Sequence, residues 1–256
     1  MLLEGKVVLV TGSSTGIGKA IADTCSLEGA KVMVHGLEPG ETEAAARELG
    51  CPFLACDLRA AESAPALIQA TLAHYGRIDA VVNNAASTKR SDLETTDAGT
   101  FDDIVAVNLR APLLLIREAL PHFRAQGGGS VVNIGSVNAY CGEPNLLAYS
   151  ISKGGLMTLT RNLADAYGSE KIRFNQLNLG WTLSENEIAL KVKEGLAPDW
   201  YLRVPEAFAP SGALIRPEQV AAHAVFWLSE ASAPVTGSVL ELEQYPIIGR
   251  NPGKEN

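Results

Sequence analysis

The sequence has little of what membranes, disulfides or secretion require. None of its 256 residues fall in an apolar run of roughly 18, so we expect no membrane-spanning helix. The first residues lack the basic start and long apolar segment of a secretory signal. The four cysteines show no Cys-x-x-Cys spacing and are interpreted as reduced thiols: Cys25, Cys51, Cys56 and Cys141. These absences predict a cytoplasmic protein.

Metal-ligand patterns and an excess of positive charge are missing as well. The four histidines have no i,i+4 pair and no acidic companion at ligand spacing, so no metal site is expected: His35, His74, His122 and His223. The formal net charge of -8 argues against a nucleic-acid groove or a surface for anionic membranes. We therefore expect a small-molecule substrate, and neither nucleic acid nor membrane as a partner.

Short apolar segments alternate with longer segments of helical pattern. The predicted strands are Lys6–Val10, Lys31–Val34, Pro52–Ala55, Ala80–Val82, Ser130–Ile134, Ile172–Leu179 and Ser238–Leu242. The predicted helices are Gly16–Glu28, Glu41–Leu49, Ala64–Tyr75, Phe101–Phe123, Ala148–Tyr167 and Pro217–Leu228. This alternation predicts an α/β fold, a Rossmann-like doubly wound parallel sheet of about seven strands with helices on both faces. No repeat or linker divides the chain, so residues 1–256 are predicted to form one domain.

The segment Thr182–Arg216 interrupts the alternation. It lies between the sixth strand and the last helix, and it carries three prolines, Trp200 and Tyr201. It is too long for an ordinary connection, and connections of this length tend to be lids or binding loops. We expect it to be a substrate lid.

A glycine-rich turn, Thr11–Gly18, follows the first strand and opens a helix. Glycines there let the backbone approach a pyrophosphate, which rests on the N–H groups of the new helix. Such a turn is often only a turn, but its place between strand and helix favours nucleotide binding. The loop residues expected to bind the cofactor are Gly12, Ser14, Thr15, Gly16, Ile17 and Gly18.

A second group of residues indicates hydride chemistry. Tyr149 and Lys153 are spaced i,i+4 and share one helical face, and Ser136 ends the fifth strand. When hydride leaves a carbinol carbon, the hydroxyl proton must leave too, and a tyrosine with its usual pKa of ~10 is a poor base. Lys153 and the positive ring of an oxidised nicotinamide would favour the phenolate, while Ser136 would hold the substrate oxygen.

Each of these residues also has a plain structural explanation. Tyr149 and Lys153 could be a surface pair, and Ser136 could simply end a strand. Their order behind a nucleotide loop favours the catalytic interpretation.

In these motifs the chain resembles the short-chain dehydrogenase/reductase family. The family pattern T-G-x-x-x-G-x-G matches the turn at Thr11, and Asn83–Ala86 is similar to its N-N-A-G, with alanine for the last glycine. The similarity covers roughly residues 5–180 and 215–243. It implies that Asn108 anchors a water leading to the lysine. The further residues that it implies at the cofactor are Asp57, Leu58, Asn84, Ala85, Tyr149, Lys153, Gly180 and Thr182. Leu179 replaces the usual proline before Gly180.

The choice of nicotinamide cofactor depends on charge after the second strand. The family's acidic position, typical of NAD binding, falls on Gly36, and its basic position, typical of NADP binding, falls on Leu37, which is expected at the cofactor. Thr15 is not the basic residue common in NADP users. Glu38 would repel a phosphate of about -2 charge if it points inward, or it is a solvated loop residue. NAD is favoured, with NADP as the alternative.

The predicted substrate-binding residues are Ser136, Asn138, Tyr149 and Trp181. Further residues expected around the pocket are Tyr140, Cys141, Glu143, Glu185, Asn186, Trp200 and Tyr201. Hydrogen-bonding groups beside aromatic rings suit a polyhydroxylated substrate such as a sugar, aldonate or polyol, although they could equally solvate a lid. The alternatives are an NADPH-dependent carbonyl reductase of the ketoacyl type and a non-catalytic dinucleotide-binding scaffold. A scaffold would be expected to have lost one of the three catalytic groups.

The end of the chain and the oligomeric state leave alternatives open. Where the family often has a strand followed by a D-G-G turn, this chain has Val239–Pro246 and then Ile247–Arg250, with aromatic and basic groups in place of the glycine turn. This tail therefore either packs over a pocket or a neighbouring subunit, or lies on the surface. The resemblance implies a homo-oligomer, a tetramer or dimer, paired through Ala148–Tyr167. The stripe Leu156, Leu159 and Leu163 on that helix could equally pack on the chain's own sheet.

Overall fold

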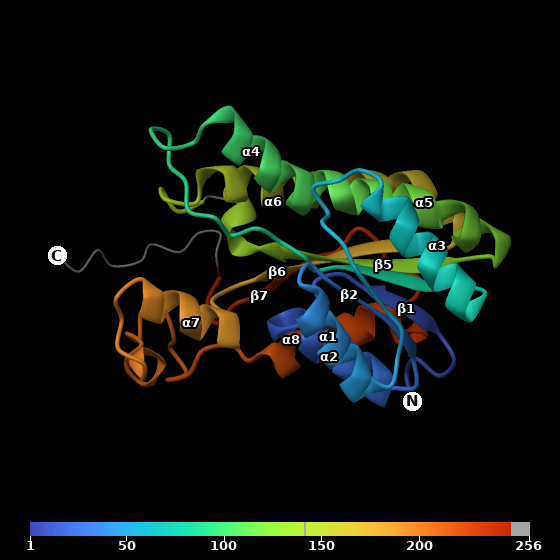
Figure 1. Ribbon diagram of the computed structural model, residues 1–256, viewed down its shortest axis with the longest axis horizontal. Coiled ribbons are helices and arrows are strands. Elements are labelled where there is room, and N and C mark those ends of the chain that lie inside the picture. Colours follow the sequence, from blue (N-terminus) through green and yellow to red (C-terminus); the bar gives the residue numbers. More distant parts are fainter. Residues whose placement is uncertain (141, 247–256) are drawn as a thin grey trace.

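Seven parallel strands form one sheet in the computed structural model, which describes residues 1–140 and 142–246. The strand order is β3-β2-β1-β4-β5-β6-β7, and the sheet crosses the middle of the molecule (Figure 1). The strands are β1 (Val7–Val10), β2 (Lys31–Gly36), β3 (Phe53–Ala55), β4 (Ala80–Asn83), β5 (Gly129–Ser136), β6 (Ile172–Leu179) and β7 (Val239–Leu242). The predicted Rossmann-like sheet is confirmed.

Helices cover both faces of this sheet (Figure 1). On one face lie α1 (Gly16–Leu27), α2 (Pro39–Leu49) and α8 (Pro217–Leu228). On the other lie α3 (Ser63–Tyr75), α4 (Ala98–Val105), α5 (Ala111–Ala125) and α6 (Leu147–Tyr167). Each layer encloses its own apolar core, the first including Ile21 and Val225 and the second Leu67, Phe123 and Phe174. Burial on both faces explains why the central strands β1 and β4 are apolar almost throughout.

The strand order reverses between β1 and β4. These two strands pair with each other in parallel, with Val8 opposite Ala80. At such a reversal the connections after the two strands leave toward opposite faces, and a crevice opens at their carboxyl ends. The loop after β1 is the glycine-rich turn, and Asn84 follows β4. The topology therefore brings the two predicted cofactor motifs together.

The sequence predicts one helix at Phe101–Phe123. In the structure the helical segment is longer than this and is interrupted. Between α4 and α5 the chain forms one π-helical turn, η1 (Ala106–Arg110), which contains Asn108. A π turn inserts one extra residue and so changes which side chains face inward after it. The buried Asn108 side chain is directed into the protein from this turn.

The segment expected to be a lid contains a helix that the sequence analysis does not predict, α7 (Glu185–Lys193). Ser184 caps its first turn, which is acidic, and its last turn is basic, as the helix dipole favours. Trp200 and Leu214 are buried in a small apolar cluster within this segment. The segment thus has a core of its own beside the sheet (Figure 1).

The residues after β7 pack against this segment. The Gln244 amide oxygen accepts hydrogen bonds from the backbone and hydroxyl of Ser211, and its amide nitrogen donates to the Ala213 carbonyl. The described part of the tail therefore lies over the insertion, while Ile247–Arg250 and Cys141 lie outside the described residues.

Two further observations concern surfaces. On α6, Leu156 is buried and Leu163 packs against the apolar core that contains Phe123 and Phe174, so part of the leucine stripe faces the chain's own fold. Among the described residues, no helix is both long and apolar enough to cross a membrane.

Candidate active site

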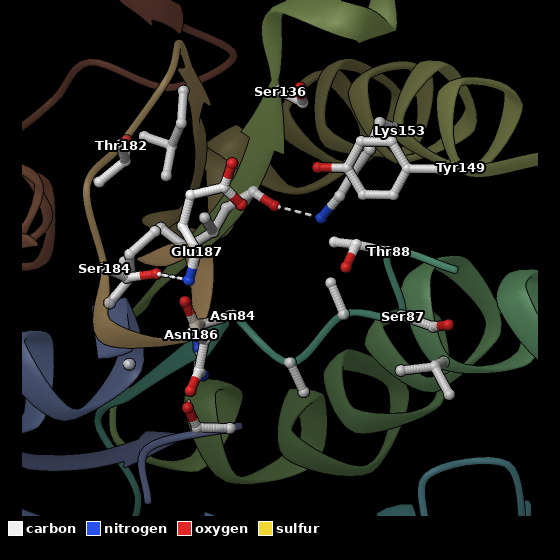
Figure 2. A pocket seen from close by; sticks show the side chains of 18 of the residues that line it. Asn84, Ser87, Thr88, Ser136, Tyr149, Lys153, Thr182, Ser184, Asn186 and Glu187 are labelled. Carbon is white, nitrogen blue, oxygen red and sulfur yellow. Dashed lines mark hydrogen bonds between the residues drawn. The ribbon is translucent and has the colours of Figure 1, made fainter. Parts of the chain in front are cut away.

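A cleft of about 1370 Å³ opens at the carboxyl ends of the strands, between the glycine-rich turn, β4, β5 and the insertion. Figure 2 shows its walls. The predicted site residues that line it are Gly12, Ser14, Thr15, Ile17, Gly18, Leu37, Asp57, Leu58, Asn84, Ala85, Ser136, Asn138, Tyr149, Lys153, Gly180, Trp181 and Thr182. Gly16 and Asn108 are not among the described residues that line it. The fold thus gathers almost the whole predicted site in one place.

The glycine-rich turn has the shape that a pyrophosphate requires. Gly12 and Gly16 have φ values of 62° and 56°, which other residues rarely adopt. A Cβ on Gly18 would overlap the Gly12 carbonyl and the Asn84 amide. Thr15, the residue before α1, makes no side-chain cap, and its hydroxyl accepts from the Asn186 amide of α7 instead, at 3.0 Å. The N–H groups of this first turn are therefore available to an anion, and the turn fits a dinucleotide.

Asn84 holds the turn from behind. Its amide nitrogen donates to the carbonyls of Thr11 and Gly12 at 2.9 and 3.0 Å, and the Thr11 hydroxyl accepts from the backbone of Asn84 and Ala85. Asn84 is thus engaged with the turn itself, although the sequence predicts it at the cofactor.

His35 supports the same turn, a contact that the sequence analysis does not predict. Its Nδ1 accepts the Gly12 N–H at 3.0 Å, so the ring proton is on Nε2, 3.1 Å from the Cys56 carbonyl. Burial lowers the pKa of His35, which favours this neutral ring.

Gly36, at the end of β2, leaves no room for the family's acidic side chain. A Cβ there would overlap the Thr42 hydroxyl and crowd Ser14. The next residue, Leu37, is mostly exposed at the edge of the cleft. Any charge that selects between NAD and NADP must therefore come from other residues.

Acidic side chains dominate this end of the cleft. They are Glu38, Glu41, Asp57 and Asp103, against a single arginine, Arg59. The Arg59 guanidinium lies 2.6 Å from Asp57 and 3.3 Å from Asp103, and its hydrogen bond to Asp57 lowers the pKa of that carboxyl group. The lining at this end of the cleft therefore carries more negative than positive side chains.

Ser136, Tyr149 and Lys153 come together on the opposite wall (Figure 2). Ser136 ends β5, and its hydroxyl accepts the Asn138 N–H at 3.2 Å. Tyr149 and Lys153 extend from the first turns of α6, with the Lys153 Nζ 5.6 Å from the centre of the Tyr149 ring. That Nζ donates to the Ile134 carbonyl at 2.7 Å, and burial lowers the pKa of Lys153 to about 8.

In the protein without cofactor, the pKa of Tyr149 lies above its usual value. Burial raises this pKa, the Ser136 hydroxyl opposes the rise, and the negative charges of Glu187 and Glu143 add to it. A phenolate in this cleft loses hydration and meets like charge, so the lowering expected from Lys153 and a bound nicotinamide stays a prediction.

Asn108 connects the loop after β4 to α6. Its amide oxygen accepts the Ser87 N–H at 2.7 Å, and its amide nitrogen donates to the Ser87 carbonyl and the Ser152 hydroxyl at 3.0 Å. Ser152 in turn donates to the Tyr149 carbonyl. Asn108 thus lies behind Tyr149, and the water path implied by the resemblance stays a prediction.

The insertion supplies the remaining wall. Trp181 stacks on Trp200, with ring centres 5.1 Å apart and 16° between the planes, and its indole N–H donates to Glu187 at 2.8 Å. Of the residues expected around the pocket, Glu143 and Asn186 line the cleft. The expectation was wrong for four others, which are not among the described residues that line the cleft: Tyr140, Glu185, Trp200 and Tyr201.

Other lining residues are not predicted from the sequence. They include Ser87, Thr88, Ser184, Glu187, Leu190, Lys191 and Tyr245. Most of those named belong to α7 or to the loop after β4, where no periodic pattern marks the side that faces the cleft. The one available signal was the Ser-x-x-Glu spacing of Ser184 and Glu187, which is typical of a helix start.

Comparisons with known proteins agree with this site. A family model described as enoyl-(acyl carrier protein) reductase matches residues 12–243. The 2-dehydro-3-deoxy-D-gluconate 5-dehydrogenase of Escherichia coli is 31% identical over 94% of this chain and 95% of its own. The D-threitol dehydrogenase of Mycolicibacterium smegmatis is 32% identical over 94% of this chain and 92% of its own.

Among solved structures, the L-sorbose reductase of Gluconobacter frateurii, complexed with NADPH and L-sorbose, superimposes with a TM-score of 0.88. It is 28% identical and is matched over 95% of this chain and 97% of its own. Fold and cleft together define an oxidoreductase that transfers hydride between a nicotinamide cofactor and a secondary alcohol or ketone. The chain belongs to the short-chain dehydrogenase/reductase family.

Proposed function

We propose that this protein is an NAD-dependent dehydrogenase of a hydroxylated small molecule, a sugar, aldonate or polyol, with Tyr149 as the group that exchanges the hydroxyl proton. The observation that carries the proposal is the position of Tyr149 between Ser136 and Lys153, in the same cleft as the glycine-rich turn (Figure 2). A nucleotide turn and a proton-transfer group in one cleft are what alcohol oxidation needs.

In the proposed mechanism, Ser136 binds the substrate oxygen and Tyr149 removes its proton. Bound oxidised nicotinamide supplies a positively charged ring that accepts the hydride. Lys153, whose pKa is lowered by burial to about 8, still carries a positive charge near neutral pH and stabilises the Tyr149 phenolate. Asn108 acts as a positioning residue, because its contacts reach α6 through Ser152 beside Tyr149.

The preference for NAD rests on charge. Glu38 and Glu41 line the cleft beside Leu37, and Arg59, the one arginine near them in the lining, is already paired with two aspartates. A ribose phosphate would meet this acidic surplus, whereas the ribose hydroxyls of NAD can donate to carboxylates.

The substrate class rests on the polar wall that faces Tyr149 and on relatives. Trp181, Asn138 and Glu187 offer an aromatic surface and hydrogen-bonding groups together. The relatives named above act on a sugar acid, a polyol and a sugar by their names. Both observations support a substrate with several hydroxyl groups.

The second candidate is an NADPH-dependent carbonyl reductase of the ketoacyl type. It is favoured by the sorbose reductase structure, which holds NADPH and is by its name a reductase. The acidic lining beside Leu37 speaks against it.

We propose a cytoplasmic homo-oligomer, a dimer or tetramer. Apolar side chains are exposed on α5 and α6, where Leu113 is 44% and Ile151 is 50% accessible, and near β7, where Val235 is 46% accessible. Burying such positions against a second copy would be favourable. Size-exclusion chromatography with light scattering measures the assembly.

The function is tested by a screen of purified protein with NAD or NADP against alditols, aldoses, aldonates and simple secondary alcohols, followed by nicotinamide absorbance. We expect reduction of NAD with at least one polyhydroxylated compound and a lower kcat/KM with NADP. Activity confined to NADPH and apolar or acyl ketones would contradict the proposal and favour the second candidate.

A further inference from the structure

Glu187 stands out on the substrate wall because its side chain crosses the cleft toward Tyr149 (Figure 2). It belongs to the first turn of α7, and the Ser184 hydroxyl accepts its backbone N–H at 3.1 Å. The negative charge of Glu187 also acts on the Tyr149 hydroxyl. The two side chains therefore face the same space.

The position of the carboxylate is fixed by its neighbours. The indole N–H of Trp181 donates to Oε1 at 2.8 Å, and Trp181 is held in turn between the stacked ring of Trp200 and the edge-on ring of Phe208. Within the described part of the chain, Oε2 accepts no hydrogen bond, and the Glu187 carboxylate faces the cleft. An oriented carboxylate oxygen open to a binding cleft is a strong acceptor for a hydroxyl donor.

Cationic side chains at this end of the cleft already have partners. Lys191 and Arg90 share the carboxylate of Glu194, at 2.8 and 3.1 Å, and Lys89 donates to the Thr100 hydroxyl. A second carboxylate, Glu143, also lines the cleft. Lys153, the cation beside the Tyr149 ring, donates to the Ile134 carbonyl, and the carboxylates that act on the Tyr149 hydroxyl are Glu187 and Glu143. An anionic group placed against these two carboxylates would be repelled.

We infer that Glu187 is a substrate-binding residue whose Oε2 accepts a hydrogen bond from a hydroxyl group next to the reacting carbinol. The cleft thereby selects neutral polyhydroxylated compounds, alditols or sugars, over aldonates. This inference rests on the proposed function and narrows its substrate class.

The test uses Glu187→Gln, which keeps the size of the side chain and an oxygen for Trp181 but removes the charge. Glu185→Gln is the matched control, because Glu185 lies in the same helical turn, is exposed and does not line the cleft. The probes are the best neutral alditol or aldose from the screen and D-gluconate.

We expect Glu187→Gln to lose about tenfold in kcat/KM for the neutral probe, mainly through KM. The ratio of its kcat/KM for gluconate to that for the neutral probe should rise by a larger factor, because the repulsion is removed. Glu185→Gln should behave as wild type, and NADH affinity, measured by fluorescence titration, should be equal in all three proteins.

Two results would overturn the inference. One is a wild-type enzyme that prefers gluconate; the other is an unchanged ratio of the two probes in Glu187→Gln with cofactor binding intact. A wild-type protein that turns over no hydroxylated compound would instead refute the proposed function, and the inference with it, so the two failures are distinguishable.

Discussion

Single residues at the end of β2 determine the charge that a cofactor meets. Gly36 cannot carry the family's acidic side chain, because Thr42 and Ser14 occupy the space that a Cβ would need. Leu37, the next residue, is exposed at the edge of the cleft and can be replaced without disturbing packing. The cofactor preference is therefore open to change at position 37.

We predict that Leu37→Arg raises kcat/KM with NADP by about tenfold or more, because a guanidinium can pair with the additional phosphate. Leu27→Arg, at an exposed position on α1 outside the cleft, is the control for added positive charge. Steady-state rates with both cofactors measure the effect. No gain with NADP relative to the control would show that position 37 does not contact the ribose phosphate.

At this scale, the sequence predicts residues that have a fixed spacing on a regular element. Tyr149 and Lys153 share one face of α6, and Ser136 ends the neighbouring strand β5, so their meeting follows from helix and sheet geometry. Glu187 could not be predicted in this way. Its place depends on the path of the insertion and on the stacking of Trp181 on Trp200, which no local pattern contains.

At the scale of elements, the π turn between α4 and α5 positions Asn108. One wide turn of five residues leaves no signature in a sequence whose helical pattern continues on both sides, so the sequence predicted a single uninterrupted helix. The turn lets the Asn108 side chain satisfy both backbone groups of Ser87 and reach Ser152 on α6.

We predict that Asn108→Ala lowers the free energy of unfolding by about 2–4 kcal/mol. The change leaves the backbone groups of Ser87 and the Ser152 hydroxyl without the hydrogen bonds that they make to the Asn108 amide. The kcat should fall together with it, since α6 carries Tyr149. Asn145→Ala, which changes an exposed side chain, is the control. Urea unfolding measures stability, and a loss below about 0.5 kcal/mol would contradict this account of the turn.

At the scale of the whole molecule, the strand order and the cleft follow from the alternating strands and helices, because right-handed crossovers place the loops after β1 and β4 together. The segment from residue 182 to 216 was predicted only as a lid. Its helix α7 has nine residues, none of them fully buried, and is capped by Ser184, so no amphipathic pattern marks it in the sequence.

The burial of Lys153 also affects the stability of the whole protein. Its pKa falls from 10.5 to about 8 on folding, so the unfolded chain binds the proton more tightly. The resulting loss of stability is fully present below about pH 8 and is relieved as the pH rises toward 10.5.

We therefore predict that the free energy of unfolding of wild type rises relative to that of Lys153→Met as the pH is raised from about 8 to 10, by at most about 3 kcal/mol. Lys193→Met, at an exposed position of α7, should show no such trend. Denaturant unfolding across this range provides the comparison. A difference between wild type and Lys153→Met that stays constant with pH would refute the assigned protonation.

The account depends most on Tyr149 as the proton-transfer group, and the variant Tyr149→Phe tests it most directly. The measurement is the turnover of the best substrate from the screen, alongside NADH affinity by fluorescence titration. We predict that kcat falls by roughly a hundredfold or more while NADH affinity stays within about twofold of wild type, because only the hydroxyl group is removed. Turnover equal to that of wild type, with the cofactor still bound, would contradict the central claim.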